Sequence, residues 1–331
     1  MEQSVAEMLE RFQLRVAITD FCNIGCVFCS NEGMACDQRD TGNVSAEDFA
    51  YLLEVLGKNG LKDLSLTGGD PTLHPELGRI LGAVNSTQGL EQKFFHTNGI
   101  ELDRALATGG LDAFTKIAVS VHAFDYGAWK KITHGSQQQY ERLMANLTHL
   151  GEAGYGRRVE IKHVPVEGIN TSDEMFRRTL DFCSQYGFRF KFLNLEAIEK
   201  WQVRLAQPIE DLTQKLERLG CEQIPDQRTF RGQSSYLPIT PLSYKGNRGV
   251  VIEIGCGEKD ACDACYDSNE IFVMPPLDLK PCHVSNYTIP LAQAVHERDE
   301  RAILDKVVES RRFLQTRPGL DAKYWRLKVV Q

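Results

Sequence analysis

The sequence contains no uninterrupted run of about 18 apolar residues, the length from which a membrane-spanning helix is suspected. Its first residues, MEQSVAEMLERF, lack the basic start and apolar core of a secretory signal peptide. It also has no surplus of basic charge, because 38 Lys and Arg stand against 45 Asp and Glu, a formal net charge of −7. These absences predict a cytoplasmic protein without a membrane span. They also argue against nucleic acid as a partner, since that affinity depends on Lys and Arg at phosphates.

The ten cysteines of the chain are unevenly distributed. In a protein without a secretion signal, clustered cysteines indicate metal binding or catalysis rather than a disulfide framework. One group comprises Cys22, Cys26 and Cys29. A second comprises Cys256, Cys262, Cys265 and Cys282, whereas Cys36, Cys183 and Cys221 stand apart.

Up to about residue 200, short β-rich runs alternate with helical patterns. Six segments contain runs typical of strands: 14–19, 63–71, 93–99, 116–124, 158–166 and 188–196. Segment 63–71 ends in a glycine turn, and segment 93–99 includes a turn. Helices are expected between them, with Ser45 and Asp125 as N-caps and with one helix over 172–186. Six strand–helix steps predict an α/β fold, a partial (β/α)6 barrel of the TIM type with helices outside a parallel sheet.

Polar residues and glycines fall where the predicted strands end. They are Cys22, Gly68, Asn98, Ser120, Lys162 and Asn194. In parallel barrels the active site is built at the carboxyl ends of the strands. We therefore expect the chemistry to be concentrated on that rim.

The pattern changes after residue 200. The segment 207–220 predicts an amphipathic helix with Ile209, Leu212, Leu216 and Leu219 facing inward. Residues 238–255 are punctuated by Pro and Gly and close on a strand, and residues 290–313 are expected to be helical. We expect a barrel over 10–200 and a C-terminal extension over 201–331, which contains the second cysteine group.

The first cysteine group lies in FCNIGCVFCS, residues 21–30, with the spacing C-x3-C-x2-C. A structural zinc ion usually takes four protein ligands. Three thiolates in one tight loop instead suit an iron–sulfur cube in which one iron has no protein ligand. A zinc site that borrows a distant ligand, or three unrelated buried cysteines, are the alternatives that the spacing leaves open.

This loop, with an aromatic residue before its third cysteine, resembles the signature of the radical S-adenosylmethionine (SAM) enzymes. LTGGDPTLHP, HTNGI, VSVHAFD, YERLMANLTHLGEAG and VEGINTSDE follow in the order and spacing of the molybdenum-cofactor GTP cyclase branch. The resemblance covers roughly residues 10–290. It implies a SAM-binding [4Fe–4S] cluster, reductive cleavage of SAM to a 5′-deoxyadenosyl radical, and an electron donor such as flavodoxin or ferredoxin.

The resemblance also implies roles for residues on the rim. GGDP, residues 68–71, is similar to the GGE motif of the family, with Asp in place of Glu. Gly68 and Gly69 would allow close backbone approach, and Asp70 would accept from the amino group of SAM. Thr97, Asn98 and Ser120 match strand-end positions that contact the ribose and methionine parts of SAM in relatives.

The second cysteine group resembles the auxiliary iron–sulfur site of the cyclase branch and of twitch and SPASM extensions. Cys262, Cys265 and Cys282 match the three ligands of the cyclase cluster. Cys256 is an additional cysteine. If it is a ligand, which we favour, this second [4Fe–4S] cluster is fully protein-bound and relays electrons; if not, one iron is open to substrate. Taken alone, the spacing would also suit structural zinc.

Several features separate the chain from the cyclases. Where those enzymes have a basic NRLR-like stretch, this sequence reads YDSNEIF, and Asp267 and Glu270 would repel phosphate. The chain also ends in YWRLKVVQ rather than in Gly-Gly. Arg15 does match a basic position of the branch. We therefore expect an enzyme other than a GTP cyclase, acting on a less anionic substrate.

The expected substrate is a small polar metabolite such as a sugar, nucleoside or aminocyclitol. The expected outcome is dehydrogenation, decarboxylation, epimerisation or C–C bond formation in a biosynthetic pathway. The catalytic candidates are Cys36, His122, Lys162 and Glu196, with His163 and Asn194 also near the rim and Cys183 and Cys221 as further thiols. Only thirteen residues precede Leu14, which disfavours the alternative of a peptide-maturing enzyme. A non-catalytic iron–sulfur or zinc protein is a further alternative, which GGDP disfavours.

Overall fold

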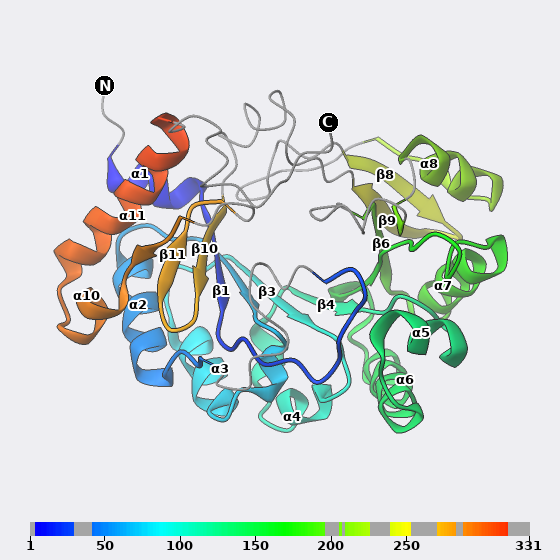
Figure 1. Ribbon diagram of the computed structural model, residues 1–331, viewed down its shortest axis with the longest axis horizontal. Helices are drawn as coiled ribbons and strands as arrows, with labels where there is room; N and C mark the ends of the chain where they lie inside the picture. The colour runs from blue at the N-terminus through cyan, green and yellow to red at the C-terminus, as the bar shows by residue number, and fades with distance from the viewer. Residues whose placement is uncertain are drawn as a thin grey trace.

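A computed structural model describes residues 4–29, 42–195, 205–206, 209–225, 239–252, 270–282 and 287–316, the side chains of 209–211 and 314–316 excepted. Six parallel strands form the centre of one curved sheet, with helices on its outer side (Figure 1). They are β1 (Gln13–Ala17), β2 (Asp63–Thr67), β3 (Gln92–Thr97), β4 (Lys116–Ser120), β5 (Val159–His163) and β6 (Arg189–Leu193). The predicted partial (β/α)6 barrel is thus confirmed.

The strand predicted over 116–124 is too long. Strand β4 ends at Ser120, and after the Val121 amide donates to the Lys162 carbonyl at 2.9 Å the chain leaves the sheet. The buried side chain of Asn170 then donates to the His122 carbonyl at 2.7 Å. An apolar sequence run therefore continues here as a buried loop rather than as a strand.

The helices of the barrel begin at capping side chains. Ser45 accepts from the Asp48 amide, Asp125 from the Ala128 amide and Ser172 from the Met175 amide, so both predicted caps are confirmed. The α-helices are α1 (Val5–Arg11), α2 (Ala46–Lys58), α3 (Leu77–Ser86), α4 (Leu102–Leu106), α5 (Tyr126–Thr133), α6 (Gln137–Glu152) and α7 (Asp173–Tyr186). Short 3-10 turns are η2 (Pro71–Leu73), η3 (Gly110–Ala113) and η4 (Gly156–Arg158).

The strands of the C-terminal part extend both edges of the same sheet. Strand β9 pairs in parallel with β6, and β10 pairs in parallel with β1. The order is β12-β11-β10-β1-β2-β3-β4-β5-β6-β9-β8-β7. The elements are α8 (Ile209–Arg218), β7 (Glu222–Gln223), β8 (Ile239–Tyr244), β9 (Asn247–Ile252), β10 (Glu270–Met274), β11 (Asp278–Lys280), β12 (Ile289–Pro290), α10 (Ala292–His296) and α11 (Glu300–Thr316).

The main core lies between the outer face of the sheet and the helices. Side chains along a strand alternate between its two faces. One set of positions, including Leu64, Leu66, Ile117, Val119 and Ile161, is fully buried in this core. The alternate positions face the inside of the curved sheet, where Ala17, Phe272 and Met274 form a small separate apolar cluster.

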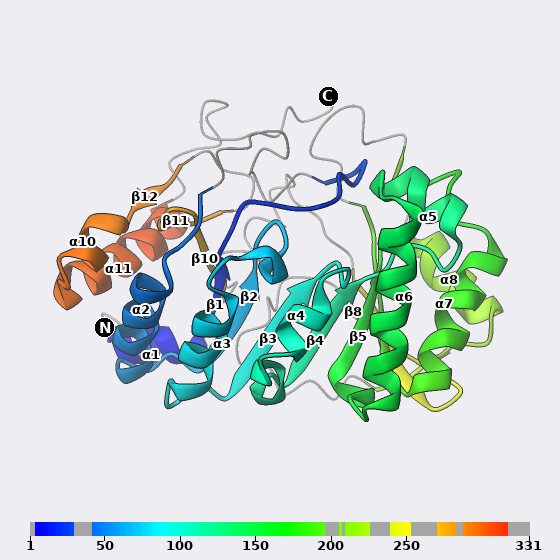
Figure 2. The ribbon, with the colours of Figure 1, turned by 90° about the horizontal axis from the view of Figure 1, so that it is seen from below.

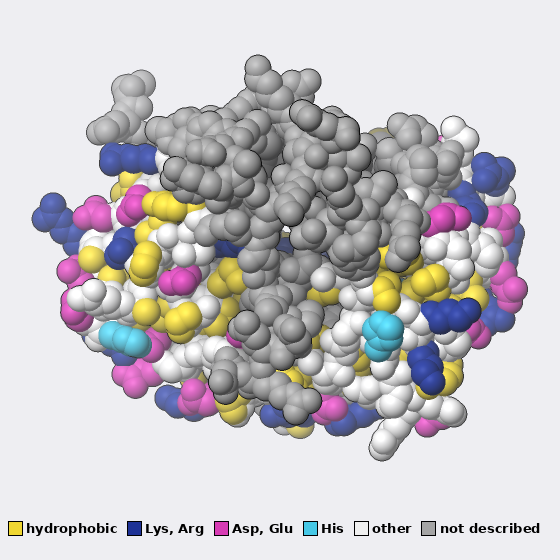
Figure 3. Space-filling view, viewed as in Figure 1, with side chains coloured by type: hydrophobic (Ala, Val, Ile, Leu, Met, Phe, Trp, Pro, Cys, Tyr) yellow, Lys and Arg dark blue, Asp and Glu magenta, His cyan; other side chains and the backbone are white. Residues whose placement is uncertain are grey.

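Acidic and basic side chains are interspersed around the coloured part of the surface in Figure 3. This distribution agrees with the near balance of the two signs in the sequence. Within the described ranges, no helix is both long enough and apolar enough to cross a membrane.

Candidate active site

The first cysteine group lies on the loop that follows β1, at the carboxyl edge of the parallel strands. Figure 2 shows the chain running from the end of β1 along this edge towards α5. The loop continues the pairing of β1 with β2, because the Gly69 amide donates to the Thr19 carbonyl and the Asp70 amide to the Phe21 carbonyl, both at 2.8 Å. The predicted rim position of the loop is therefore confirmed.

Gly68 and Gly69 allow this close approach of two backbones. A Cβ atom on Gly68 would lie 2.6 Å from the Thr19 carbonyl oxygen, and one on Gly69 would lie 2.2 Å from the Phe21 carbonyl oxygen. Any side chain at either position would push the cysteine loop away from β2. The two glycines thus have a role within the protein, which is to seat this loop.

The far side of the loop is held by α5 and α6. The amides of Gly25 and Val27 donate to the carbonyls of Thr133 and Ile132, at 3.0 and 2.8 Å. The side chain of Gln139 donates to the Asn23 carbonyl at 3.0 Å. Hydrogen bonds hold one end of the loop to the turn after β2 and the other end to α5 and α6. The barrel therefore determines the position of the three cysteines.

Cys22 and Cys26 are half-buried on this loop, and Cys29 is exposed. The side-chain amide of Asn98 lies 3.7 Å from the Cys22 sulfur, within hydrogen-bonding distance for a sulfur acceptor. Three soft thiolates with an adjacent N–H donor fit an iron–sulfur cluster. Among the described residues, no group of three or more His, Cys, Asp and Glu is arranged to hold a single metal ion.

Asp70 is fully buried, and its carboxylate is engaged by donors of the protein itself. It accepts from the amide and the hydroxyl of Thr72, from the hydroxyl of Thr97 at 2.9 Å and from the amide of Asn98 at 2.6 Å. Burial raises the pKa of Asp70, although these hydrogen bonds oppose the rise. Contact of this carboxylate with the amino group of SAM remains a prediction.

The other predicted SAM contacts lie along the same rim. Thr97 and Asn98 follow one another at the end of β3, and both are buried. Ser120 ends β4, where it pairs in register with Lys162 of β5. The structure therefore brings Gly68, Gly69, Asp70, Thr97 and Asn98 together around the cysteine loop, with Ser120 one strand further along.

The inner face of the sheet carries a cluster of charges. Glu160 of β5 lies between Lys116 of β4, at 3.2 Å, and Lys191 of β6, at 4.0 Å. Burial alone would raise the pKa of Glu160, but Lys116, Lys191 and Lys162 lower it to about 2. This carboxylate is therefore ionised at neutral pH.

Two further pairs line the same face. The ammonium of Lys162 donates to Nδ1 of His96, whose pKa is held well below its usual range by burial and by the Lys162 charge. On the other side, Arg15 pairs with Glu270 at 3.3 Å. The expectation that Glu270 repels phosphate is thereby weakened, because its charge is offset by Arg15.

The remaining catalytic candidates differ in their surroundings. His122 is buried against the Phe28 ring of the cysteine loop, and burial followed by the Lys162 charge lowers its pKa to about 3. His163 faces the opposite side of β5, where it packs among Phe176 and Phe192. This position removes His163 from the inner face.

Two of the three isolated cysteines, Cys183 and Cys221, are core residues. Cys183 is fully buried in α7, as expected, and burial strongly raises the pKa of its thiol. Burial raises the pKa of the Cys221 thiol to about 12. Neither thiol is suited to reaction at neutral pH. The predicted residues Cys36, Glu196, Cys256, Cys262, Cys265 and Asp267 lie outside the described residues, whereas Cys282 is described and half-buried after β11.

The sequence prediction omits most of the inner face. His96, Lys116, Glu160 and Lys191 emerge only from the structure. A signal was present, since Glu160 and Lys162 alternate with the apolar residues Val159 and Ile161, and period two places both charges on one face. The loop that carries the three cysteines thus lies at the carboxyl edge of a sheet whose inner face is charged.

Comparison with known proteins agrees with this geometry. Residues 16–220 match the family model described as the radical SAM superfamily. The chain therefore belongs to the radical SAM superfamily, whose members use a [4Fe–4S] cluster together with SAM.

Within that superfamily, the chain is similar to GTP 3′,8-cyclases. It is 24% identical to the enzyme of Haemophilus influenzae over 296 residues, which cover 88% of this chain and 84% of the relative. It is also 24% identical to the probable GTP 3′,8-cyclase of Pyrobaculum aerophilum, covering 88% and 90% of the two chains.

The fold is shared with a solved structure, Streptococcus suis SuiB bound to S-adenosylmethionine. The TM-score is 0.64 at 17% identity, with 90% of this chain and 65% of SuiB covered. This chain thus spans slightly less than two thirds of the SuiB chain. At this identity the likeness concerns the fold alone.

Proposed function

We propose that this protein cleaves SAM reductively at a [4Fe–4S] cluster held by Cys22, Cys26 and Cys29, and that it abstracts hydrogen from a small polar metabolite. The observation that supports this most is that backbone hydrogen bonds fix the cysteine loop, to the turn after β2 on one side and to the end of α5 on the other. Such a loop presents three thiolates in fixed positions above the inner face of the barrel. Cys22, Cys26 and Cys29 would hold the cluster, which when bound and reduced would supply the one electron that cleavage of SAM requires.

The inner face supports a polar substrate. Lys116, Glu160 and Lys191 are each less than one fifth exposed, so they lie within a protected wall rather than on the open surface. Ion pairs in such a wall offer donors and acceptors to hydroxyl, amino or acidic groups of a bound molecule. Lys162 pairs in register with Ser120, the last residue of β4, and with Lys191 of β6, so these two lysines lie nearer the rim than Lys116 and Glu160. Lys162, which neighbours the end of β4, is our candidate for substrate contact.

A second cluster is part of this proposal. Cys282 follows β11, in which Lys280 pairs with Phe272, so Cys282 lies beside the beginning of β10. The cysteine loop follows the end of β1, and β10 runs parallel to β1. Cys282 and the cysteine loop therefore lie near opposite ends of the paired strands β1 and β10. We infer an auxiliary [4Fe–4S] cluster held by Cys262, Cys265 and Cys282 from the cysteine spacing of the second group. A Cys256→Ala variant with lower iron content than wild type would identify Cys256 as a fourth ligand.

The central test is an anaerobic incubation of the reconstituted, reduced protein with SAM and candidate metabolites. Formation of 5′-deoxyadenosine and the mass of the metabolite are followed together. We expect 5′-deoxyadenosine from wild type and none from a Cys26→Ala variant. A Cys183→Ala variant is the matched control, because Cys183 is buried in α7 away from the loop.

The product mass distinguishes the outcomes. Loss of two hydrogens indicates dehydrogenation, loss of carbon dioxide indicates decarboxylation, and an unchanged mass with deuterium uptake indicates epimerisation. GTP is included because the relatives are GTP 3′,8-cyclases. A cyclised product from GTP would overturn the proposed substrate class but not SAM cleavage.

Two results would overturn more of the proposal. Turnover of a peptide in place of a small metabolite would favour peptide maturation, the activity class suggested by the likeness to SuiB bound to its precursor peptide. Bound iron without any 5′-deoxyadenosine would show a non-catalytic iron–sulfur protein.

A further inference from the structure

We propose that the side-chain amide of Asn98 donates a hydrogen bond to the Cys22 thiolate and thereby raises the reduction potential of the cluster, with Asp70 as the residue that positions Asn98. This inference rests on the proposed function, because it requires a cluster on Cys22. It assigns Asp70 a task within the protein, in addition to the predicted contact with the SAM amino group.

The amide of Asn98 has only one orientation that satisfies its neighbours. Its Oδ1 accepts from the Ile100 amide at 3.0 Å. Its Nδ2 must therefore point towards the cysteine loop, where it donates to Asn23 Oδ1 at 2.8 Å and lies 3.7 Å from the Cys22 sulfur. An amide nitrogen carries two hydrogens, so both contacts are made at once.

Asp70 anchors the backbone from which this side chain projects. The Asn98 amide donates to Asp70 Oδ2 at 2.6 Å, a short bond to a fully buried carboxylate. The same carboxylate accepts from the hydroxyls of Thr97 and Thr72. Its four bonds join the turn after β2 to the end of β3. A hydrogen bond to a charged acceptor is stronger than one between neutral groups, so this junction should be stiff.

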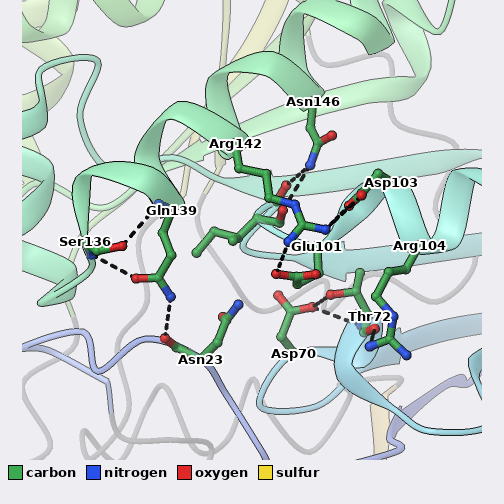
Figure 4. A network of polar contacts seen from close by, with 12 residues as sticks. Asn23, Asp70, Thr72, Glu101, Asp103, Arg104, Ser136, Gln139, Arg142 and Asn146 are labelled. Atoms are coloured by element: carbon green, nitrogen blue, oxygen red, sulfur yellow. Dashed lines mark hydrogen bonds and ion pairs between the residues drawn. The ribbon is translucent and has the colours of Figure 1, made fainter.

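The segment that carries the Cys22 acceptor is also anchored by hydrogen bonds, next to Cys22 at Asn23. Asn23 is fixed through its carbonyl by Gln139, and Gln139 is itself held in the capping box of Ser136. Figure 4 shows Gln139 reaching from the helix start to Asn23, with Asp70 and Thr72 on the other side of the same region. Donor and acceptor thus belong to two separately anchored segments, which keeps the amide aimed at the sulfur.

The expected effect follows from electrostatics. Reduction adds one negative charge to the cluster and its thiolates. A hydrogen-bond donor at a cluster sulfur stabilises the reduced state more than the oxidised state, which raises the reduction potential. Asn98 is buried, so water does not replace the donor readily when the amide is removed.

The test is a redox titration of the reconstituted cluster without SAM, followed by electron paramagnetic resonance. We expect the midpoint potential of N98L to be more negative than that of wild type, because the donor is lost at similar size. N98D, which also adds a negative charge, should be more negative still. D70N should shift the potential in the same direction but less, because it weakens the anchor and leaves the amide in place.

N23A is the matched control. It removes the second acceptor of the Asn98 amide and leaves the donor to Cys22, so its potential should equal that of wild type. Equal potentials for wild type, N98L and N98D would overturn the inference while leaving the cluster and the proposed function intact. An unshifted D70N would overturn the role of Asp70. Loss of the cluster from both Asn98 variants but not from N23A would show a role in assembly and would also overturn the tuning proposal.

A wild-type protein that binds no cluster after reconstitution would instead contradict the proposed function itself. Iron content and the visible absorption of each variant are therefore measured before the titration. The two failures are in this way distinguishable.

Discussion

The two faces of the same strands have opposite chemistry. On β4 and β5 the outward positions include Ile117, Val119 and Ile161, all fully buried against helices. The inward positions of these strands include Lys116, Glu160 and Lys162. The outer face stabilises the fold through burial of apolar area, whereas the inner face holds charges that must be stabilised by ion pairs because they are partly desolvated. A wall that keeps partly buried charges at such a desolvation cost is typical of a binding site.

Neighbouring phenylalanines on β3 provide the strongest test of this comparison. Phe95 is fully buried on the outer face, where its ring meets that of Phe114 at 5.4 Å, while Phe94 faces inward below the Lys116 ammonium. F95A should lower the free energy of unfolding by about 3–5 kcal/mol, and F94A by clearly less, as measured by denaturant titration. Equal losses would show that the two faces contribute alike.

The inner face should be the one that responds to acid. Lowering the pKa of Glu160 from 4.5 to about 2 corresponds to about 3 kcal/mol, since each tenfold change in proton affinity is worth about 1.4 kcal/mol. Because the folded-state pKa is depressed, this stabilisation is present above pH 4.5 and is lost as pH falls towards 2. E160Q should therefore be less stable than wild type at pH 7, and the difference should shrink across that window in urea titrations.

An E160Q variant whose deficit is the same at pH 7 and pH 3 would contradict the ion-pair origin of the effect. F95A serves as the control here, because its deficit arises from lost packing and should change little with pH.

One polar pair interrupts the apolar outer face. His163 Nδ1 and the Thr179 hydroxyl lie 3.1 Å apart, both fully buried. T179V should cost about 1–2 kcal/mol, because it leaves a buried imidazole nitrogen without its partner at nearly unchanged volume. Thermal unfolding at pH 7 measures this loss, and a T179V protein as stable as wild type would indicate that the pair is dispensable.

The smallest expected effect has the opposite sign. Gly82 lies within α3 on the side away from the sheet, and a Cβ built there meets nothing within 4 Å. G82A should stabilise the protein by up to about 1 kcal/mol, since Ala is a better helix former than Gly. The change should leave 5′-deoxyadenosine formation unaffected, and a loss of stability would contradict the open surroundings of this position.

The fold was largely predictable because its signals are local. Period-two and helical patterns located all six barrel strands, and Ser45 and Asp125 were identified as caps from their residue type. The predicted end of β4 was wrong, because an apolar run shows that a segment is buried but not where its backbone stops pairing with the next strand. The pairing of β9 with β6 and of β10 with β1 was also not predictable, since it joins segments far apart in the sequence.

The site was predictable in part. The spacing of Cys22, Cys26 and Cys29 and the GGDP turn indicated a cluster loop at the rim. The surroundings of Asp70 could not be predicted, because its donors Thr97 and Asn98 come from the end of another strand, β3. His96 and Lys191 were missed for the same reason, since each is recognised as part of the site only by its contact with a residue on a neighbouring strand.

By itself, the sequence determined that three thiolates share one loop and that glycines follow the next strand, because these are facts of spacing and residue type. Tertiary structure alone decided what the glycines and Asp70 do. A Cβ at Gly69 meets the backbone of Phe21, and the Asp70 carboxylate is buried among donors from its own turn and from the end of β3. The physical reason is that steric contact and desolvation depend on which segments meet in space, which no local pattern specifies.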